Sequence, residues 1–362
     1  ARFVRLCHEN GIRVVVDGVF NHTGREFFAF QDIREKREAS PYKDWYRGVN
    51  FGWGSPLGDP FGYEAWQGHF ELPCLNLRNP EVRQYLFNSI QFWVDNFNID
   101  GIRLDCANVL DFGFMKELRE KTSAMKPDFW LMGEVIHGEY NRWVNPEMLH
   151  SVTNYELHKA LYSGHNDHNY FEIAHNVRRL EAVGRSLYTF VDNHDEDRIA
   201  SKLNNLANLF PVYQLLFTLP GIPSVYYGSE WGIEGKRSRT SDEVLRPALN
   251  LSDMLGKAPE LASHIAALGK IHTENDAFHN ASYKELLLTN RQYAFSRSGE
   301  HGTVISAVNN DEQPASISIP LPCAASDVVS LLPGEIPFSL ENGRLSVTLP
   351  ANGGAIFKLQ EV

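Results

Sequence analysis

Short apolar runs that end in charged or polar residues recur along the chain, and longer segments with helical periodicity separate them. An apolar run of this kind is typical of a parallel strand, because helices cover both faces of a parallel sheet. We expect such strands near residues 12–17, 101–105, 130–134, 148–153, 187–192 and 222–227, and helices over 80–96, 112–125, 170–183 and 199–216. This alternation predicts an α/β barrel whose functional rim lies at the carboxyl ends of the strands.

The segment that follows His22 and runs to about Arg78 interrupts the alternation, and it is too long for an ordinary connection between a strand and a helix. Phe, Tyr and Trp are frequent in it. We expect an inserted domain over residues 23–78, with about two thirds of its rings in its own core and a few free to stack on sugar rings.

The last part of the chain, residues 278–362, consists of short segments with alternating polarity that Gly, Pro and Asn punctuate. This pattern predicts an antiparallel β-sandwich. The barrel domain would then comprise residues 1–22 and 79–277.

The charge balance limits the partners of the chain. Its 362 residues include 34 basic and 45 acidic side chains, for a net charge of −11, which argues against nucleic acid and anionic membranes as main partners. No apolar run approaches the roughly 18 residues of a membrane span. Four cysteines without a CxxC spacing indicate neither a zinc site nor a disulfide framework. Neutral substrates such as sugars remain compatible with this composition.

Charged and histidine side chains follow four of the expected strands at their carboxyl ends, namely Asp17 and His22, Arg103 and Asp105, Glu134, and His194 and Asp195. Arg103 and Asp105 share one face of their strand because side chains alternate along it. Since the carboxyl ends of barrel strands meet at one rim, we expect all these groups to converge there.

Each of these residues has a simpler interpretation when taken alone. An aspartate at a strand end often caps the next helix, a histidine can be part of the core, and Arg103 could neutralise a buried acid. Burying several carboxylates at one rim is costly without a task, however. Two carboxyls that flank one bond are the usual apparatus of glycoside hydrolysis. Asp105, beside Arg103, suits the ionised nucleophile, and Glu134, after an apolar strand, suits the acid/base.

Six segments resemble the conserved motifs of the α-amylase family of glycoside hydrolases, which includes cyclomaltodextrinases and neopullulanases. They are Asp17-Gly-Val-Phe-Asn-His22, Leu72-Pro-Cys-Leu-Asn76, Gly101-Ile-Arg-Leu-Asp-Cys-Ala-Asn108, Gly133-Glu-Val135, Phe190-Val-Asp-Asn-His-Asp195 and Gly221-Ile-Pro-Ser-Val-Tyr-Tyr-Gly-Ser-Glu230. The order and spacing of the family are kept across nearly the whole chain.

The resemblance implies a (β/α)8 TIM barrel with an inserted domain B and a C-terminal sandwich. It also implies a retaining mechanism through a covalent glycosyl-enzyme. The positions that match the family's catalytic residues are Asp105 for the nucleophile, Glu134 for the acid/base and Asp195 for the transition-state stabiliser. Those that match its substrate-binding or supporting residues are Arg103, His194, His22 and Asp17. Asn21 matches a position that binds calcium in many amylases, although the family's intracellular branch frequently lacks the ion.

The chain departs from the family at its start, because the strand at 12–17 matches the third strand of the barrel. The first two βα units have no counterpart. We favour a truncated chain over a natively short one whose barrel a partner chain completes. The residues Cys106, Ala107 and Asn108 after the expected nucleophile resemble the cyclomaltodextrinase branch, which favours short maltodextrins.

Three hypotheses follow for the function. The leading one is a retaining hydrolase of α-1,4-glucosidic bonds in maltodextrins or starch. The second is a glucanotransferase of the same family, in which a sugar instead of water resolves the intermediate. The third is a catalytically silent carbohydrate-binding protein. We expect an α-glucan as the partner, no required cofactor and a cytoplasmic location, with secretion as the alternative; the oligomeric state is left open.

Overall fold

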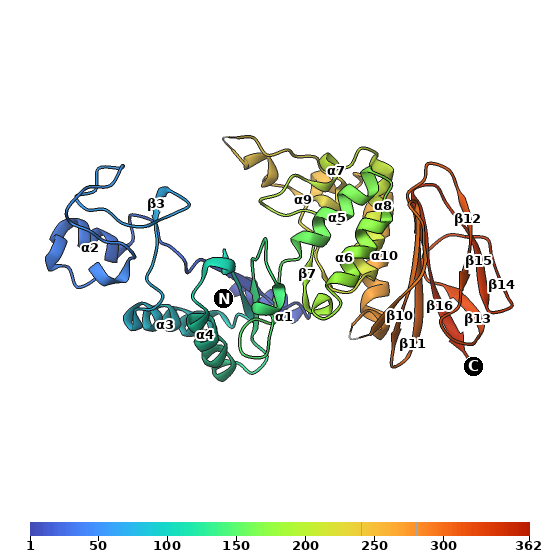
Figure 1. Ribbon diagram of the computed structural model, residues 1–362, viewed down its shortest axis with the longest axis horizontal. Helices are drawn as coiled ribbons and strands as arrows, with labels where there is room; N and C mark the ends of the chain where they lie inside the picture. Colours follow the sequence, from blue (N-terminus) through green and yellow to red (C-terminus); the bar gives the residue numbers. More distant parts are fainter. Residues whose placement is uncertain (240, 280) are drawn as a thin grey trace. The chain divides into compact units, whose positions relative to one another are not determined.

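The computed structural model describes residues 1–239, 241–279 and 281–362. The chain divides into two compact units, Ala1–Thr153 and Asn154–Val362, and each is described by itself (Figure 1). No helix within the described residues combines the length and the apolar character needed to cross a membrane.

A parallel sheet of four strands forms the centre of the first unit, in the order β1-β4-β5-β6. Its strands are β1 (Val15–Gly18), β4 (Gly101–Leu104), β5 (Trp130–Gly133) and β6 (Ser151–Val152). Ile102, Leu104 and Leu131 have no exposed surface, as expected of strands covered on both faces. The register pairs Asp17 with Arg103, so the strand ends that carry charges lie side by side.

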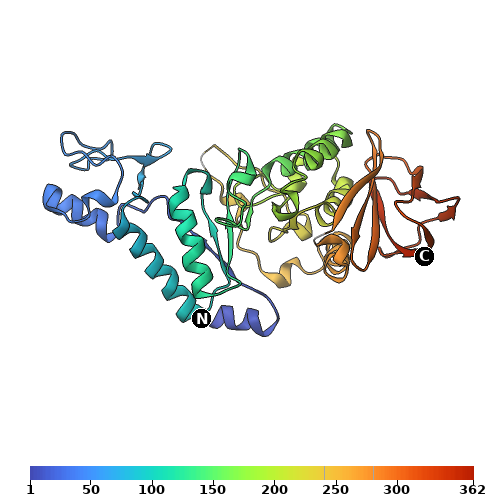
Figure 2. The ribbon, with the colours of Figure 1, turned by 60° about the horizontal axis from the view of Figure 1, so that its bottom comes forward.

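The first unit also contains the helices α1 (Arg2–Glu9), α3 (Pro80–Phe97) and α4 (Phe112–Met125). The bounds of α3 follow from its sequence, because the Asn79 side chain accepts the Glu81 N–H, Pro80 occupies the first turn and Asn98 ends the helix in the left-handed conformation. Figure 2 shows α3 and α4 side by side. The rings of Phe87 in α3 and Phe114 in α4 stack with their centroids 5.7 Å apart.

The inserted segment contains α2 (Phe28–Lys36), β2 (Ala65–Trp66) and β3 (His69–Pro73), and it has an aromatic core. The ring of Phe30 contacts those of Tyr46, Phe61 and Tyr63 at centroid distances of 5.0–5.4 Å, and all four side chains are buried. Trp53, by contrast, is exposed. Gln67 and Gly68 both have positive φ and form the tight turn between β2 and β3.

The second unit contains a pair of parallel strands, β7 (Tyr188–Thr189) and β8 (Ile222–Pro223). Its helices are α5 (Tyr155–Asn166), α6 (Tyr170–Arg179), α7 (Ile199–Lys202), α8 (Leu209–Thr218), α9 (Leu251–Met254) and α10 (Pro259–Glu274). The expectation of one helix over 199–216 is wrong. Leu203 is extended and the Asn205 side chain caps the next turn by accepting the Ala207 N–H, because asparagine favours caps over helix interiors.

The six predicted strands are all present, and each observed strand is shorter than the apolar run that predicted it. In the described part of the chain they form two separate parallel sheets and no closed ring.

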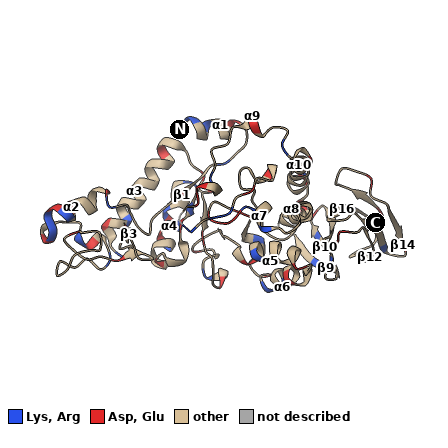
Figure 3. Ribbon diagram, turned by 90° about the horizontal axis from the view of Figure 1, so that it is seen from above, with Lys and Arg blue, Asp and Glu red and all other residues tan. Residues whose placement is uncertain are grey.

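The end of the chain forms two antiparallel sheets, in the orders β13-β16-β11-β10-β9 and β12-β15-β14. The strands are β9 (Ser282–Leu288), β10 (Gln292–Gly299), β11 (Gly302–Asn309), β12 (Ala315–Pro320), β13 (Ala325–Ser330), β14 (Phe338–Glu341), β15 (Arg344–Leu349) and β16 (Gly353–Glu361). Ile305 and Phe357 of one sheet and Ile319 and Leu345 of the other belong to the same buried cluster. Figure 3 shows few Lys, Arg, Asp and Glu residues on these strands.

Candidate active site

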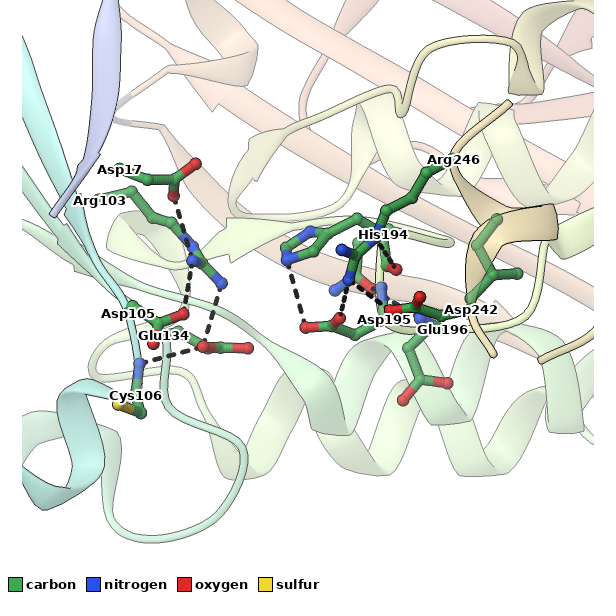
Figure 4. Close-up of polar contacts among 12 residues, drawn as sticks. Asp17, Arg103, Asp105, Cys106, Glu134, His194, Asp195, Glu196, Asp242 and Arg246 are labelled. Carbon is green, nitrogen blue, oxygen red and sulfur yellow. Dashed lines mark hydrogen bonds and ion pairs between the residues drawn. The ribbon is translucent and has the colours of Figure 1, made fainter. Parts of the chain in front are cut away.

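One guanidinium holds three carboxylates at the carboxyl edge of the first unit's sheet (Figure 4). Arg103 Nη1 lies 3.1 Å from both Asp17 Oδ1 and Asp105 Oδ1, and Arg103 Nη2 lies 3.0 Å from Glu134 Oε2. We call these four residues the Arg103 cluster. The predicted convergence of Asp17, Arg103, Asp105 and Glu134 is therefore present in the structure.

The sheet itself positions this cluster. The ladder continues past the strand ends, since Asp105 N–H donates to Gly18 O at 3.2 Å and Glu134 N–H donates to Leu104 O at 2.9 Å. The backbone N–H of Cys106 donates to Glu134 Oε2 at 3.1 Å. Glu134 thus receives one hydrogen bond from a backbone group and one ion pair from Arg103, which fix its carboxylate against the neighbouring strand.

Burial strengthens the electrostatics of the cluster. The Arg103 side chain is 15% exposed and that of Glu134 10%. Burial alone would lower the pKa of Arg103, but the attraction of Glu134, Asp17 and Asp105 outweighs it and raises that pKa above its usual value. The guanidinium therefore stays charged, and it can hold two carboxylates with different nitrogens at once.

His22 lies in the same unit, beside the ring of Trp66. The two rings stack with centroids 6.1 Å apart and planes 18° from parallel. Burial lowers the pKa of His22, partly opposed by the charge of Asp105, so the ring is held toward its neutral form. Trp66 reaches this place from the tight β2–β3 turn of the inserted segment, and the sequence had counted it only as one ring among many.

The second unit carries His194 and Asp195 in the segment that follows β7. The Asn193 side chain accepts the N–H groups of Asp195 and Glu196 at 2.9 Å each, a local turn of the kind that asparagine favours. His194 Nε2 lies 3.2 Å from Asp195 Oδ2. The side chain of Asp195 is thus partly exposed, and its carboxylate is bound by His194.

Arg246, which the sequence interpretation missed, completes this second group. Its Nη2 lies 2.9 Å from Asp195 Oδ1 and 2.7 Å from Asp242 Oδ2, and its Nε donates to His194 O at 3.1 Å. We call Asp195, His194, Arg246 and Asp242 the Arg246 cluster (Figure 4). Arg246 lies in an irregular segment far along the chain from Asp195, where no strand periodicity could have singled it out.

Calcium binding at Asn21 stays a prediction. The amide nitrogen of Asn21 lies 3.3 Å from His22 Nδ1 and 3.9 Å from Cys74 Sγ. Asn21 lines a cavity of about 580 Å³ whose acidic residues, Glu64 and Asp111, are ion-paired with arginines. Among residues 1–239, 241–279 and 281–362, no group of three or more His, Cys, Asp or Glu side chains is arranged to hold a metal.

Most of the chain is similar in sequence to known proteins. Residues 1–250 match the family model described as "Alpha amylase, catalytic domain". A cyclomaltodextrinase of Geobacillus thermopakistaniensis and a maltogenic alpha-amylase of Bacillus acidopullulyticus are each 30% identical over 99% of this chain and 61% of their own length. The chain thus spans about three fifths of these curated relatives.

A solved structure supports the same similarity. The acarbose-soaked debranching enzyme of Nostoc punctiforme superposes with a TM-score of 0.85 at 27% identity, over 99% of this chain and 78% of that one.

Proposed function

This chain belongs to the α-amylase family of glycoside hydrolases, with its TIM-barrel catalytic domain followed by antiparallel sheets, and we propose that it is a retaining hydrolase of α-1,4-glucosidic bonds in maltodextrins or starch. The observation that carries the proposal is the attachment of Asp105 and Glu134 to two nitrogens of one guanidinium. Such an arrangement keeps two carboxyls close together, as a retaining enzyme needs, with their separation expected at roughly 5–5.5 Å.

In this mechanism the Asp105 carboxylate attacks the anomeric carbon and forms a covalent glycosyl ester. Glu134 gives its proton to the departing glycosidic oxygen, then takes a proton from the water that attacks the ester, which releases the sugar with its anomeric configuration retained. Arg103 orients the Asp105 carboxylate for this attack, because its Nη1 lies 3.1 Å from Asp105 Oδ1.

The remaining residues have supporting roles in the proposal. His22, which burial holds toward the neutral form, can both donate and accept hydrogen bonds with sugar hydroxyls. Asp17 adds negative charge beside Arg103. We assign Asp195 and His194 to the binding of sugar hydroxyls and to the stabilisation of the positively charged transition state. No step passes through a metal ion.

Two further proposals concern the chain as a whole. We propose that a preceding segment supplies the first two βα units of the barrel. In support, β1 pairs only with β4 among the described strands, and the adjoining Val15 and Val19 are 39% and 47% exposed, which is unfavourable for an apolar sheet edge. We also propose a cytoplasmic location, supported by four cysteines that are all free.

The test is hydrolysis of maltoheptaose, cyclodextrin and pullulan by the purified protein, with proton NMR of the first product. We expect α-anomeric maltodextrins at early times and at least about a 10³-fold loss of rate in Asp105→Asn. Products longer than the substrate would identify a glucanotransferase. Binding without turnover would identify a silent carbohydrate-binding protein, and unchanged activity of Asp105→Asn would refute the mechanism.

A further inference from the structure

Arg198, in the second unit, lies only three residues after Asp195 and has no role in the mechanism proposed above. Arg198 precedes α7 and has no exposed surface. Burying a guanidinium completely is costly unless its hydrogen bonds are satisfied and its charge is balanced. The contacts of Arg198 therefore indicate what it does.

The guanidinium of Arg198 binds three separate groups. Nη1 donates to Tyr227 O at 2.7 Å and to Ser229 Oγ at 3.0 Å, and Nη2 donates to Leu245 O at 2.8 Å. Its centre lies 4.1 Å from the ring centroid of Tyr226, a favourable cation–π distance. One side chain thus connects the loop after Asp195 with the segment that follows β8 and with the turn at Leu245.

The charge of Arg198 is balanced indirectly. The Ser229 hydroxyl accepts from Arg198 and donates to Asp192 Oδ2 at 2.8 Å, and the same carboxyl oxygen accepts the Ile199 N–H at 2.8 Å. Burial raises the pKa of Asp192, and the charge of Arg198 opposes that shift. Arg198 and Asp192 therefore share one hydroxyl and fix the base of the loop that carries Asp195.

The contact with Leu245 links this network to the proposed site. Leu245 is completely buried, and its carbonyl accepts from both Arg198 and the Tyr226 hydroxyl, the latter at 3.1 Å. The next residue is Arg246, whose guanidinium binds Asp195 at 2.9 Å. Arg198 thus holds the backbone on both sides of the contact between Arg246 and Asp195.

We infer that Arg198 is a positioning residue that aligns the Arg246 guanidinium with Asp195; the inference rests on the function proposed above. A lysine cannot replace it, because one ammonium group cannot direct two planar nitrogens at three acceptors on two segments. The substitution Arg198→Lys would keep the charge and lose the alignment.

The experiment is a double-mutant cycle on the purified protein, with maltoheptaose hydrolysis as the readout. We expect Arg198→Lys and Arg246→Lys each to lower kcat about tenfold, and the double variant to lower it about tenfold as well, because both changes remove one interaction. A double variant about 100-fold slower would overturn the inference, since independent effects multiply.

Arg297 provides a matched control. It is also a completely buried arginine, and it donates to Thr218 O and Phe278 O at 3.0 and 3.5 Å. Arg297→Lys is expected to lower Tm and leave kcat unchanged. An equal loss of kcat in Arg297→Lys and Arg198→Lys would show a general effect on stability and contradict the inference.

Two further measurements cover the cases in which Arg198→Lys does not fold or the protein hydrolyses no α-glucan. Tyr226→Phe removes a single hydroxyl from the Leu245 carbonyl and is expected to lower kcat about twofold to threefold, with no further loss in an Arg246→Lys background. A crystal structure of Arg198→Lys or of Tyr226→Phe decides the inference even if the protein hydrolyses no α-glucan. The absence of hydrolysis would refute only the proposed function. We expect the contact between Arg246 Nη2 and Asp195 Oδ1 to be lost, and an intact contact near 2.9 Å would overturn the inference.

Discussion

The Arg103 cluster and the Arg246 cluster differ in how rigidly their side chains are held. Each uses one arginine to hold carboxylates near the end of a parallel strand. The Arg103 side chain is 15% exposed and projects from the middle of a four-stranded sheet. That of Arg246 is 45% exposed and follows a short 3-10 turn, Glu243–Leu245.

The geometry of the two clusters has different origins. Arg103, Asp105 and Glu134 are aligned by backbone hydrogen bonds between neighbouring strands, which side-chain changes elsewhere do not disturb. The alignment of Arg246 with Asp195 depends on other side chains, with Arg198 foremost among them. We therefore expect substitutions in the first cluster to reduce both stability and activity, and substitutions in the second to act mainly on activity.

The largest expected effect is that of Arg103→Lys. A lysine cannot hold Asp105 and Glu134 with two separate nitrogens, so the buried carboxylate of Glu134 or the partly buried one of Asp105 loses its partner. We expect a loss of about 3 kcal/mol in the free energy of unfolding and a fall of about 10²–10³ in kcat. Urea unfolding and maltoheptaose hydrolysis measure the two effects, and a variant with wild-type kcat would contradict the assigned role of Arg103.

Asp100, at the opposite end of strand β4, should affect stability alone. Lys126 Nζ lies 2.6 Å from Asp100 Oδ1, and His8 Nε2 lies 2.7 Å from Asp100 Oδ2. Burial alone would raise the pKa of Asp100, but the bonds from Lys126 and the Val14 N–H outweigh it and hold that pKa at about 2.

A lowered carboxyl pKa stabilises the folded protein above the ordinary value of 3.8, and this stabilisation is lost as the pH falls toward about 2. Asp100→Asn should therefore cost about 2 kcal/mol of unfolding free energy at pH 7. It should also flatten the pH dependence of stability between these values and leave kcat unchanged. Denaturant titrations at several pH values provide the check, and an unaltered acid profile would contradict the prediction.

Arg246→Lys should have a smaller effect, and on activity alone. Exposed ion pairs contribute less than about 1 kcal/mol to stability, so Tm should change little. Because the contact with Asp195 is lost, kcat should fall about tenfold, equivalent to about 1.4 kcal/mol of transition-state free energy. If Arg246→Lys reduced Tm as strongly as Arg103→Lys, the contrast between the two clusters would disappear.

The smallest effect is expected at Trp66, which stacks on His22. An aromatic pair contributes about 0.5–1.5 kcal/mol beyond its buried area, so Trp66→Ala should raise KM a few-fold, and Trp66→Phe should largely restore it. Steady-state kinetics of both variants on maltoheptaose test this. Equal defects in the two variants would show that stacking on His22 is not the relevant property.

Strand periodicity was sufficient to predict the Arg103 cluster, because alternation along one strand and the parallel pairing of its neighbours place Arg103, Asp105 and Glu134 together. The six parallel strands and both β-sheets at the C-terminus were predictable for the same reason. The interruption of the helix after Lys202 was not, because two adjacent asparagines in a largely apolar segment are a weak signal beside its helical periodicity.

The residues of the Arg246 cluster were only partly predictable from the sequence. His194 and Asp195 could be predicted from their position after an apolar run. Arg246 and Arg198 could not, because an arginine in an irregular segment is usually a solvated surface residue, and only tertiary packing shows that Arg198 is buried. The joining of the two clusters at one rim stays a prediction of the barrel topology.

Trapping of the covalent intermediate tests directly whether Asp105 is the nucleophile of a retaining mechanism. The purified protein would be incubated with a 5-fluoro-α-glucosyl fluoride, digested and examined by mass spectrometry for a peptide that has gained one fluoroglucosyl group. We expect this group to be esterified to Asp105 and Asp105→Asn to remain unlabelled. A label on another carboxylate, or a product with inverted anomeric configuration, would contradict it.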